Sequence, residues 1–328
     1  MPGSEVDIVV VNWNSGDLLR RCVRSIAEHG DGRAARVVVV DNGSTDGSAD
    51  VEAAGTPLDV VRTGRNLGFG KACNLGAARG DAPFLLFLNP DAELRPGTLD
   101  RALAYMAEAA AGRVGVCGIR LVDEEGRAHR HCARDPKSNS FLGNSLGLTR
   151  ALRRWFPPIP LAEFDHLESR AVDHVMGAFY LMPRRVFEEV GGFDEDFFVY
   201  LEDLDLSRRV RRAGYTIQYR ADISAYHKQG GTSEKVKAHR LFYSLRSNLL
   251  YAAKHLSPPG ALAVSAVTLA VEPVSRSVRA LLRGSPEELV FTLRGFGMLY
   301  RDLPATLRIL RAVVGRRRAV RRADGTGR

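Results

Sequence analysis

The sequence predicts an α/β protein with a mostly parallel central sheet, followed by a helical and basic C-terminal region. Short apolar runs recur along residues 6–122 and are typical of strands buried on both faces. Amphipathic helical segments separate these runs with short connections, a pattern that favours a doubly wound parallel sheet flanked by helices. After residue 235 the pattern becomes helical, and residues 273–328 carry 13 Arg against 4 Asp or Glu.

The first 122 residues supply the alternating elements. Strands are predicted over residues 6–12, 36–41, 58–62, 84–88 and 114–122. The helix after the first strand places Leu19, Cys22, Val23 and Ile26 on one face. Further helices are predicted over residues 46–54, 70–79 and 99–111.

The second half of the chain is less regular. A strand is predicted over residues 172–182, helices over 184–190 and 200–213, and short strands over 215–219 and 223–227. Residues 135–170 show no clear pattern, and so long a loop inside a domain is usually a lid or a binding segment. We expect one domain over residues 1–235, with halves of about 1–122 and 123–235, and a helical region over 236–328. Proline and glycine predict helix breaks in that region at 258–259, 273, 284–286 and 304.

Bulk properties indicate the cellular setting. Four cysteines without a Cys-x-x-Cys pair fit a reducing cytoplasm better than a disulfide framework. The chain enters a strand at once, so no signal peptide is expected. The longest apolar stretch, Gly260–Val271, is about half of the roughly 20 residues that span a bilayer and then meets Glu272-Pro273. We therefore expect no transmembrane span.

The Arg-rich C-terminal region accounts for the whole net charge of +9. A neutral body with a basic tail suggests an anionic partner, either a membrane surface or a nucleic acid, with a solvated basic terminus as the alternative. No aromatic residue lies among the arginines of residues 311–322, so base stacking has no support and no nucleic acid is expected as a partner. The working hypothesis is peripheral attachment to the inner face of the cell membrane.

Asn89-Pro90-Asp91 directly follows the strand predicted over residues 84–88. An aspartate at the carboxyl end of a buried parallel strand points into the crevice where open α/β sheets bind ligands. Carboxylate oxygens there suit Mg²⁺ or Mn²⁺, which usually bridges a carboxylate to a diphosphate. The motif therefore predicts a nucleotide-sugar site, and capping of the next helix is the alternative reading of Asp91.

Two further polar loops lie at the ends of predicted strands. Asp41 opens a glycine-containing loop, through Ser48, of the kind that binds a nucleobase edge or a phosphate; an ordinary βα turn is the alternative. After the third strand, Gly68 permits close backbone approach, and three side chains offer donors to ribose or diphosphate: Asn66, Lys71 and Asn74. Neither loop has the Gly-Lys-Ser/Thr ending of a Walker loop.

Two candidates come from the second half of the chain. Glu202-Asp203 opens a helix after an aromatic segment that could desolvate Asp203, which suits a general base acting on an alcohol acceptor. The helix dipole alone also favours acidic residues in a first turn. His227 ends a strand and precedes a basic, hydroxyl-bearing loop, 228–233, that could close over a diphosphate; a structural histidine is the alternative.

In this order, the motifs resemble those of the family 2 glycosyltransferases, inverting enzymes with the GT-A fold. The resemblance covers about residues 5–235 and rests on the segments 9–14, 41–46, 66–69, 89–91, 177–179, 191–195, 202–206 with Arg209, and 213–215. The Asn-Pro-Asp form, the Phe-Phe-x-Tyr-x-Glu-Asp run and the chain length are most similar to those of bacterial rhamnosyltransferases. Those enzymes use dTDP-L-rhamnose and often act on lipid-linked cell-wall or O-antigen precursors.

The resemblance implies a nucleotide-sugar half and an acceptor half within the GT-A domain. In the first, Asp41 would contact the nucleotide base with Asn12 and Asn14 in the same pocket, and Asp91 would bind the divalent metal. Asn89 occupies the first position of what is elsewhere an Asp-x-Asp motif, which removes one carboxylate from the metal site. In the second, the implied residues are Gly177 and Ala178 bordering the acceptor, Asp203 as base, Glu202 beside it, and His227 as a metal or diphosphate contact.

The implied reaction is a single displacement. Asp203 removes a proton from an acceptor hydroxyl, which attacks the anomeric carbon from the face opposite the nucleotide. The expected donor is dTDP-L-rhamnose, and the expected acceptor is a hydroxyl of a glycan or of a polyprenyl-diphosphate-linked precursor. A UDP-hexose or UDP-N-acetylhexosamine donor would leave the fold and the mechanism unchanged and is the alternative.

Overall fold

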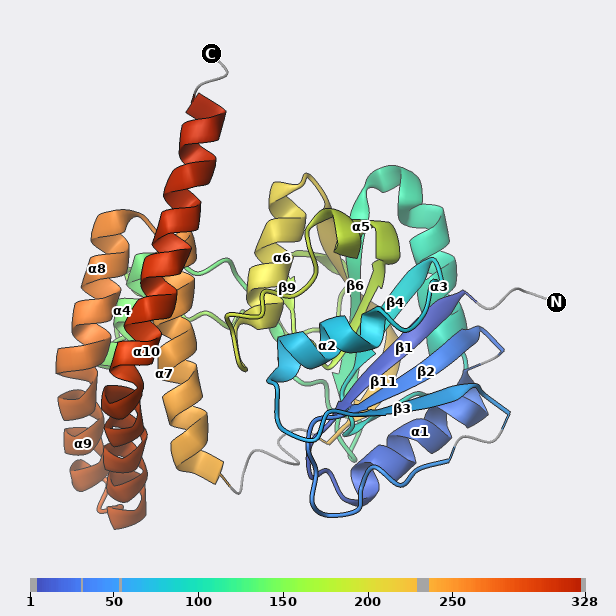
Figure 1. Cartoon of the computed structure of the whole chain (residues 1–328), viewed down its shortest axis with the longest axis horizontal. Helices are drawn as coiled ribbons and strands as arrows, with labels where there is room; N and C mark the ends of the chain where they lie inside the picture. The colour runs from blue at the N-terminus through green and yellow to red at the C-terminus, as the bar shows by residue number, and fades with distance from the viewer. Residues whose placement is uncertain (1–4, 31, 53–54, 229–235, 326–328) are drawn as a thin grey trace. The chain divides into compact units, whose positions relative to one another are not determined.

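The computed structural model describes residues 5–30, 32–52, 55–228 and 236–325 (Figure 1). The chain divides into two compact units. The sheet unit contains residues 1–135, 160–198 and 202–234, and the helical unit contains 136–159, 199–201 and 235–328. Residues 136–159, which have no clear sequence pattern, thus cluster with the C-terminal helices.

The sheet unit is built on a nine-stranded mixed sheet with the order β3-β2-β1-β4-β10-β6-β11-β5, and β8 pairs with β11. One half is parallel: β1 (Val6–Asn12), β2 (Ala34–Asp41), β3 (Leu58–Arg62) and β4 (Phe84–Leu88). In the other half, β10 (Phe179–Pro183) runs antiparallel to β4 and β6 (Val114–Val122), whereas β11 (Thr216–His227) runs parallel to β6. The remaining short strands are β5 (Ala92–Glu93), β8 (Arg170–Val172), and the separate pair β7 (Cys132–Ala133) and β9 (His174–Val175).

Helices cover both faces of this sheet. Ile8 and Val10 of β1 pack in one cluster with α1 (Asp17–His29) and α3 (Thr98–Glu108). Val9 and Val11 pack in a second cluster with α2 (Phe69–Ala77), α5 (Arg184–Glu189) and α6 (Glu202–Arg212). Because successive strand residues point to opposite faces, burial on both sides requires an uninterrupted apolar run. The predicted class, a mostly parallel sheet flanked by helices with a helical C-terminal region, is confirmed (Figure 1).

Three predicted elements of the sheet unit differ from the structure. The helix expected over residues 46–54 is absent from the described part of that range, and residues 53–54 lie outside the described residues. The strand expected over 172–182 is divided among β8, β9 and β10. The two strands expected over 215–219 and 223–227 are one strand, β11, whose pairing with β6 shifts register between Arg220 and Ser224.

The helical unit contains α4 (Ser138–Leu146), α7 (Lys237–His255), α8 (Pro258–Ala266), the π-helical segment η3 (Val267–Val271), α9 (Glu272–Leu282) and α10 (Pro286–Gly325). Helices α7 and α10 share a small core of Phe242, Leu245, Leu249, Phe296 and Leu299. The breaks expected near 258–259 and 284–286 are confirmed, because α8 and α10 begin there. Those expected at Pro273 and Pro304 are wrong, because a continuous helix runs from Pro258 to Leu282 and Pro304 lies inside α10.

Helix continuity past Pro273 has a local explanation. Proline has no N–H to donate to the carbonyl four residues earlier, which here is that of Leu269. The Tyr300 hydroxyl donates to this carbonyl at 2.6 Å, and η3 adopts the wider π-helical spacing just before the proline. The helix that contains the apolar stretch therefore does not end at Glu272-Pro273. At 25 residues, the helix from Pro258 to Leu282 is long and apolar enough to cross a membrane by length and composition.

Candidate active site

The predicted site residues gather along one edge of the sheet. Asn12 and Asp41 are the last residues of β1 and β2, Asn89 directly follows β4, and His227 ends β11. β10 runs in the opposite direction to β4, so its first residues lie at the same edge, and the Asn89 N–H donates to the Ala178 carbonyl at 3.0 Å. This is the carboxyl edge of the parallel strands, where open α/β sheets bind ligands.

On the donor side, the Asn12 carboxamide organises the loop after β2. Its nitrogen lies within hydrogen-bond distance of three acceptors: Asp41 Oδ1 at 3.0 Å, Ser44 Oγ at 3.1 Å and Ser48 Oγ at 2.9 Å. Its oxygen accepts from Ser15 Oγ. These tertiary bonds engage the side chains that would otherwise begin the predicted helix, which explains why residues 46–52 stay irregular.

Asn14 ties the loop after β1 to the same place. Its backbone lies in the left-handed region at φ 50°, where asparagine is tolerated better than most residues. Its N–H donates to Ser44 Oγ at 2.9 Å, and its Oδ1 accepts the Thr45 N–H at 2.8 Å. Asn12, Asn14 and Asp41 therefore belong to one hydrogen-bonded group, which is the grouping that the family resemblance implies.

The loop after β3 packs closely against the segment before α6. Asn66 Oδ1 accepts from the Gly68 N–H at 2.9 Å and from Asn42 Nδ2 at 3.0 Å. Gly68 has φ +89°, and a Cβ there would lie 2.4 Å from the Phe198 carbonyl oxygen. The Phe69 N–H donates to that same oxygen at 2.7 Å, so the approach leaves no room for a side chain at residue 68.

Lys71 and Asn74 are engaged with the segment 193–195. Asn74 Nδ2 donates to the Phe193 carbonyl at 2.9 Å and to Glu195 Oε1 at 3.1 Å, and Asn74 Oδ1 accepts the Phe193 N–H at 2.9 Å. Lys71 Nζ lies 3.0 Å from Glu195 Oε2. Their predicted contacts with the nucleotide-sugar stay predictions, because both side chains already have protein partners here.

Asp91 and His227 are brought together by strand pairing. β5 pairs with β11 so that Ala92 faces His227, which places Asp91 beside it. The distance from His227 Nε2 to Asp91 Oδ1 is 3.2 Å, and both side chains are buried. The loop that follows is described only at Lys228, whose N–H donates to the Asp91 carbonyl at 3.0 Å; the rest of the predicted 228–233 loop lies outside the described residues.

The chemistry of this pair fits a divalent cation that is shared with a ligand. Although it lies close to Asp91, His227 Nε2 has no hydrogen-bond partner in the described part of the chain, so it retains a free coordination position. Within the described ranges, no group of three or more His, Cys, Asp or Glu residues is arranged so that it could hold a metal ion without further ligands. Mg²⁺ commonly binds through one or two carboxylates together with substrate phosphates and water, and Asp91 supplies one such carboxylate beside the histidine nitrogen.

Asp203 lies at the start of α6, against the backbone that precedes β10. Its Oδ2 accepts the Gly177 N–H at 3.0 Å and lies 3.7 Å from His174 Nε2. Behind it, His174 Nδ1 lies 2.8 Å from Ser207 Oγ, which is 3.0 Å from the Tyr180 hydroxyl. Burial lowers the pKa of His174, which keeps the ring neutral at neutral pH.

Sequence reasoning missed this chain of buried polar groups. A single histidine in a two-residue strand carries no signal of its own. The available hint was the spacing of Asp203 and Ser207, which lie one turn apart on the same face of the predicted helix.

Glu202 differs from its neighbour. It is buried, and its Oε2 has no hydrogen-bond partner in the part of the chain that the structure describes. Burial, with a further contribution from Asp203, raises the pKa of Glu202 well above its ordinary value. Burial therefore favours the protonated form of this side chain, which suits a hydrogen-bond donor or a packing group better than a base.

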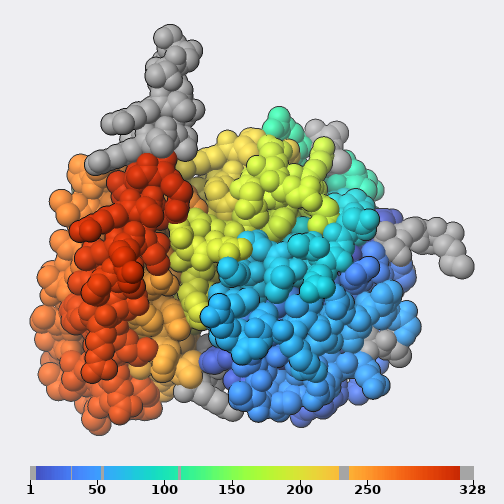
Figure 2. Space-filling view, in the orientation of Figure 1, coloured from blue at the N-terminus to red at the C-terminus, as the bar shows by residue number. Residues whose placement is uncertain are grey.

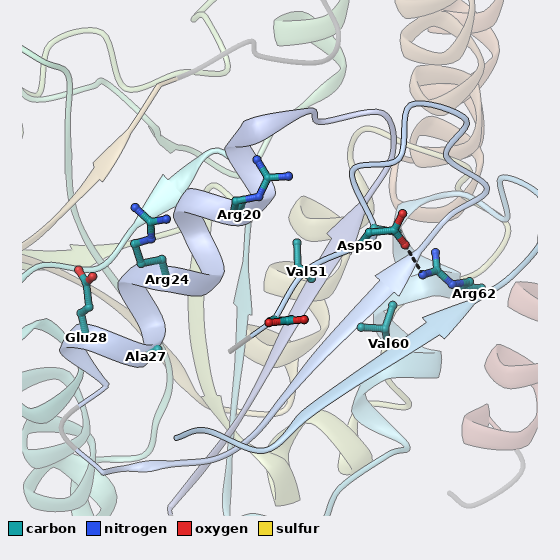
Figure 3. A pocket seen from close by; sticks show the side chains of 10 residues that line it. Arg20, Arg24, Ala27, Glu28, Asp50, Val51, Val60 and Arg62 are labelled. Carbon is teal, nitrogen blue, oxygen red and sulfur yellow. Dashed lines mark hydrogen bonds and ion pairs between the residues drawn. The ribbon is translucent and has the colours of Figure 1, made fainter. Parts of the chain in front are cut away.

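A depression of about 680 Å³ lies away from these residues, between α1 and the segments around 50 and 60 (Figure 3). Its charged side chains are all exposed, and Asp50 forms an ion pair with Arg62 at 2.8 Å. No predicted site residue lines it. Buried polar groups at strand ends are a stronger indication of a ligand site than an exposed surface hollow, so we place the candidate site at the carboxyl edge.

The profile of the family described as "Glycosyl transferase family 2" matches residues 7–191. The chain is a family 2 glycosyltransferase. The match spans β1 to the end of α5 and so contains the donor-side loops and the Asn-Pro-Asp motif. The resemblance in the sequence is thereby confirmed.

Named relatives and solved structures agree with this family. The glycosyltransferase is 29% identical over 263 residues to the N-acetylglucosaminyl-diphospho-decaprenol L-rhamnosyltransferase of Mycobacterium tuberculosis, covering 75% of this chain and 83% of the relative. It is 24% identical over 258 residues to the rhamnosyltransferase WbbL of Escherichia coli, covering 76% and 93%. The mannosyltransferase PcManGT of Pyrobaculum calidifontis, solved with GDP-Man and Mn²⁺, aligns with a TM-score of 0.51 at 18% identity, covering 95% and 85%. This last likeness supports the GT-A fold alone.

Proposed function

We propose that this glycosyltransferase transfers L-rhamnose from dTDP-L-rhamnose to a hydroxyl of a polyprenyl-diphosphate-linked glycan precursor. The observation that carries the proposal is the gathering of Asp41, Asp91 and Asp203 at one carboxyl edge of the sheet. The donor and the acceptor class rest on the two rhamnosyltransferase relatives, one of which is named for a diphospho-decaprenol substrate.

The donor-side loops bind the nucleotide in this proposal. Asp41, held by Asn12, accepts hydrogen bonds from the base, and Asn14 lies in the same pocket. Asn66 shapes the following loop, in which Gly68 allows the backbone to approach closely. Asn89 and Asp91 lie toward the diphosphate, with Gly177 and Ala178 bordering the acceptor.

Asp203 is the proposed base. Its carboxylate takes the proton of the acceptor hydroxyl as the new bond forms between that oxygen and the anomeric carbon, while the bond from the anomeric carbon to the diphosphate breaks. The Gly177 N–H and the His174 side chain hold the carboxylate in position. General-base assistance of this kind contributes roughly 10²- to 10⁴-fold in rate.

Asp91 and His227 are the proposed ligands of a divalent cation, Mg²⁺ or Mn²⁺. Such an ion, when bound, neutralises negative charge on the leaving diphosphate. Asn89 stands where a first aspartate would add a second carboxylate, so the protein itself supplies little negative charge to the ion. We therefore propose that metal affinity depends strongly on the bound nucleotide diphosphate.

A screen of nucleotide-sugars by thermal shift, with and without Mn²⁺ or Mg²⁺, tests the donor. We expect dTDP-L-rhamnose to raise the melting temperature more than UDP-glucose, UDP-N-acetylglucosamine or GDP-mannose, and the metal to increase that shift. A larger shift with a UDP-sugar would reject the rhamnose donor. Transfer to a synthetic N-acetylglucosaminyl diphosphate with a short polyprenyl chain then tests the acceptor, and transfer to the free sugar alone would contradict it.

A further inference from the structure

The helix from Pro258 to Leu282 has a reversed pattern of burial. Its buried positions include Thr268 and Glu272, both fully buried. Its exposed large residues are all apolar, and we call them the apolar stripe: Leu262, Val271, Val274, Val278, Leu281 and Leu282, which are 41–83% exposed. A surface helix of a protein surrounded by water shows the opposite arrangement, with its charged side outward.

The buried polar face is fixed in place within the helical unit. Glu272 Oε2 accepts from the Ser145 hydroxyl at 2.7 Å, and Glu272 Oε1 accepts from Arg276 Nε at 2.8 Å. The Ser275 hydroxyl donates to the Ser145 carbonyl at 2.9 Å. If the helix rotated to bury the apolar stripe, these hydrogen bonds would break. The bonds therefore hold the apolar stripe on the outside.

The dimensions of the helix match a lipid environment. It has 25 residues, and its most apolar window has a mean hydropathy of 1.3 with 17% of that window buried. At a rise of 1.5 Å per residue it is about 37 Å long, comparable to the roughly 30 Å of bilayer hydrocarbon. Single exposed apolar residues are common on proteins, but a continuous stripe of this length is typical of an interaction surface.

Helix α10 adds cationic residues to this surface. Leu293, Tyr300 and Leu307 are exposed and seven residues apart, and each is followed directly by an exposed arginine: Arg294, Arg301 and Arg308. Residues seven apart lie on one face of a helix, so apolar and cationic side chains run together along α10. The Tyr300 hydroxyl reaches the Leu269 carbonyl, which links this face to the helix that carries the apolar stripe.

A depression of about 600 Å³ between the starts of α7 and α10 has the same mixed character. Its cationic lining residues include Lys237, Arg294 and Arg301, and its apolar ones include Phe291 and Met298. Such a combination suits an anionic headgroup joined to an apolar chain. In Figure 2, α8, α9 and α10 are the orange and red atoms.

We propose that the helical unit binds an anionic phospholipid bilayer, with the apolar stripe in the acyl layer and the α10 arginines at the phosphates. Charge complementarity favours lipid over a second copy of this chain, because a copy would meet arginines with arginines. The proposal differs from attachment by the basic tail alone, since apolar insertion persists in high salt whereas phosphate attraction does not. It rests on the proposed function only in that a polyprenyl acceptor lies in a bilayer.

Vesicle flotation of the full-length protein tests the proposal without donor or acceptor. Vesicles of phosphatidylcholine with phosphatidylglycerol are compared with phosphatidylcholine alone, at low and high salt. The triple variant Val274→Gln/Val278→Gln/Leu281→Gln should lose binding at both salt concentrations. The triple variant Arg294→Gln/Arg301→Gln/Arg308→Gln should weaken low-salt binding by about fivefold for each arginine and remove the preference for anionic lipid.

The matched control is Leu152→Gln/Trp155→Gln/Leu167→Gln, which replaces exposed apolar residues outside these helices and should float like the wild type. Nucleotide binding is measured by thermal shift for each variant. A variant that binds nucleotide but not vesicles is folded and has lost lipid binding alone. A wild type that floats but binds no nucleotide would contradict the proposed function and not the lipid proposal. Wild-type flotation in the stripe variant would overturn the proposal. A wild-type protein that stays in the soluble fraction would also overturn the proposal. If that soluble protein then sedimented as a dimer, the apolar stripe would be assigned to contact with a second copy.

Discussion

The two sides of the candidate site differ in how completely their polar groups are bonded. On the donor side, one carboxamide, that of Asn12, joins the loops after β1 and β2, and its two polar atoms both have protein partners. On the other side, His227 Nε2 and Glu202 Oε2 are buried without a hydrogen-bond partner in the described residues. Buried polar groups normally have hydrogen-bond partners, so a buried polar atom without one marks a place where a ligand or an ion binds.

This difference indicates that the two sides of the candidate site have different roles. A fully bonded loop presents a fixed shape to the nucleotide before binding, which lowers the entropy cost of recognition. Polar groups without a protein partner can bind the metal, the diphosphate and the acceptor. Substitutions on the donor side should therefore act mainly on stability and binding, whereas substitutions on the other side should act mainly on metal affinity and turnover.

The largest effect is expected for Asp203→Asn. The amide keeps the volume and can still accept the Gly177 N–H, but it cannot take a proton from the acceptor. We expect kcat to fall by about 10²- to 10⁴-fold while binding of the nucleotide-sugar is retained. Initial-rate kinetics and calorimetric titration of the same preparation measure the two quantities, and a variant with near-wild-type turnover would reject Asp203 as the base.

Asp91→Asn is expected to act on the metal. Loss of an outer-shell partner typically costs about 10- to 100-fold in metal affinity, and loss of a direct ligand should cost at least as much. Titration of Mn²⁺ in the presence of dTDP should show this weakening, and nucleotide affinity should become independent of the metal. Glu93→Gln is the matched control, because Glu93 is the next carboxylate along the chain and pairs with Arg21. Equal metal affinity in the two variants would remove Asp91 from the site.

Asn12→Ala tests the fully bonded side. It leaves the buried Asp41 and two serine hydroxyls without their shared donor, which should reduce the free energy of unfolding by about 1–3 kcal/mol. We expect KM for the donor to rise more than kcat falls. Urea unfolding and initial rates measure both, with Thr45→Ala, an exposed side chain of the same loop, as the control. A large fall in kcat at unchanged stability would break the distinction between the two sides.

The smallest effect on turnover is expected for Glu202→Gln. Burial raises the pKa of Glu202, so the protonated carboxyl stabilises the fold below its ordinary pKa of 4.5, and that contribution is lost as pH rises through the raised folded-state pKa. Glutamine does not titrate. The variant should therefore lose less stability than the wild type as the pH rises above 4.5, as measured by melting temperature. An equal loss in the two proteins would show that the pKa of Glu202 is not raised in the folded state.

Much of the parallel half of the fold could be predicted from sequence. β1, β3, β4 and β6 begin and end as expected, because short runs rich in bulky and β-branched apolar residues favour strands. The helix expected over residues 46–54 failed because Ser44 and Ser48 bond to Asn12, a contact formed only in the folded state. Pro273 was expected to end a helix, but a tyrosine 27 residues later bonds the carbonyl that the proline leaves free.

The part of the candidate site that lies at strand ends could be predicted from the sequence. The part that depends on which strands pair across the sheet could not. Asp41 and Asp91 follow apolar runs and could be found from their positions along the chain, and Asn12 could be found from the family resemblance. The closeness of Asp91 and His227 depends on the pairing of β5, a two-residue strand with no sequence signal, with β11. His174 behind Asp203 depends likewise on β9, another two-residue strand.

The central claim is that adjacent carboxylates have different roles, Asp203 as the base and Glu202 as a buried acid whose pKa is raised by burial. The most direct test is kcat for sugar transfer by Asp203→Asn and Glu202→Gln, measured side by side at saturating donor and acceptor. We predict that Glu202→Gln exceeds Asp203→Asn by about 10²- to 10⁴-fold. Equal loss in the two variants, or a greater loss in Glu202→Gln, would contradict the account.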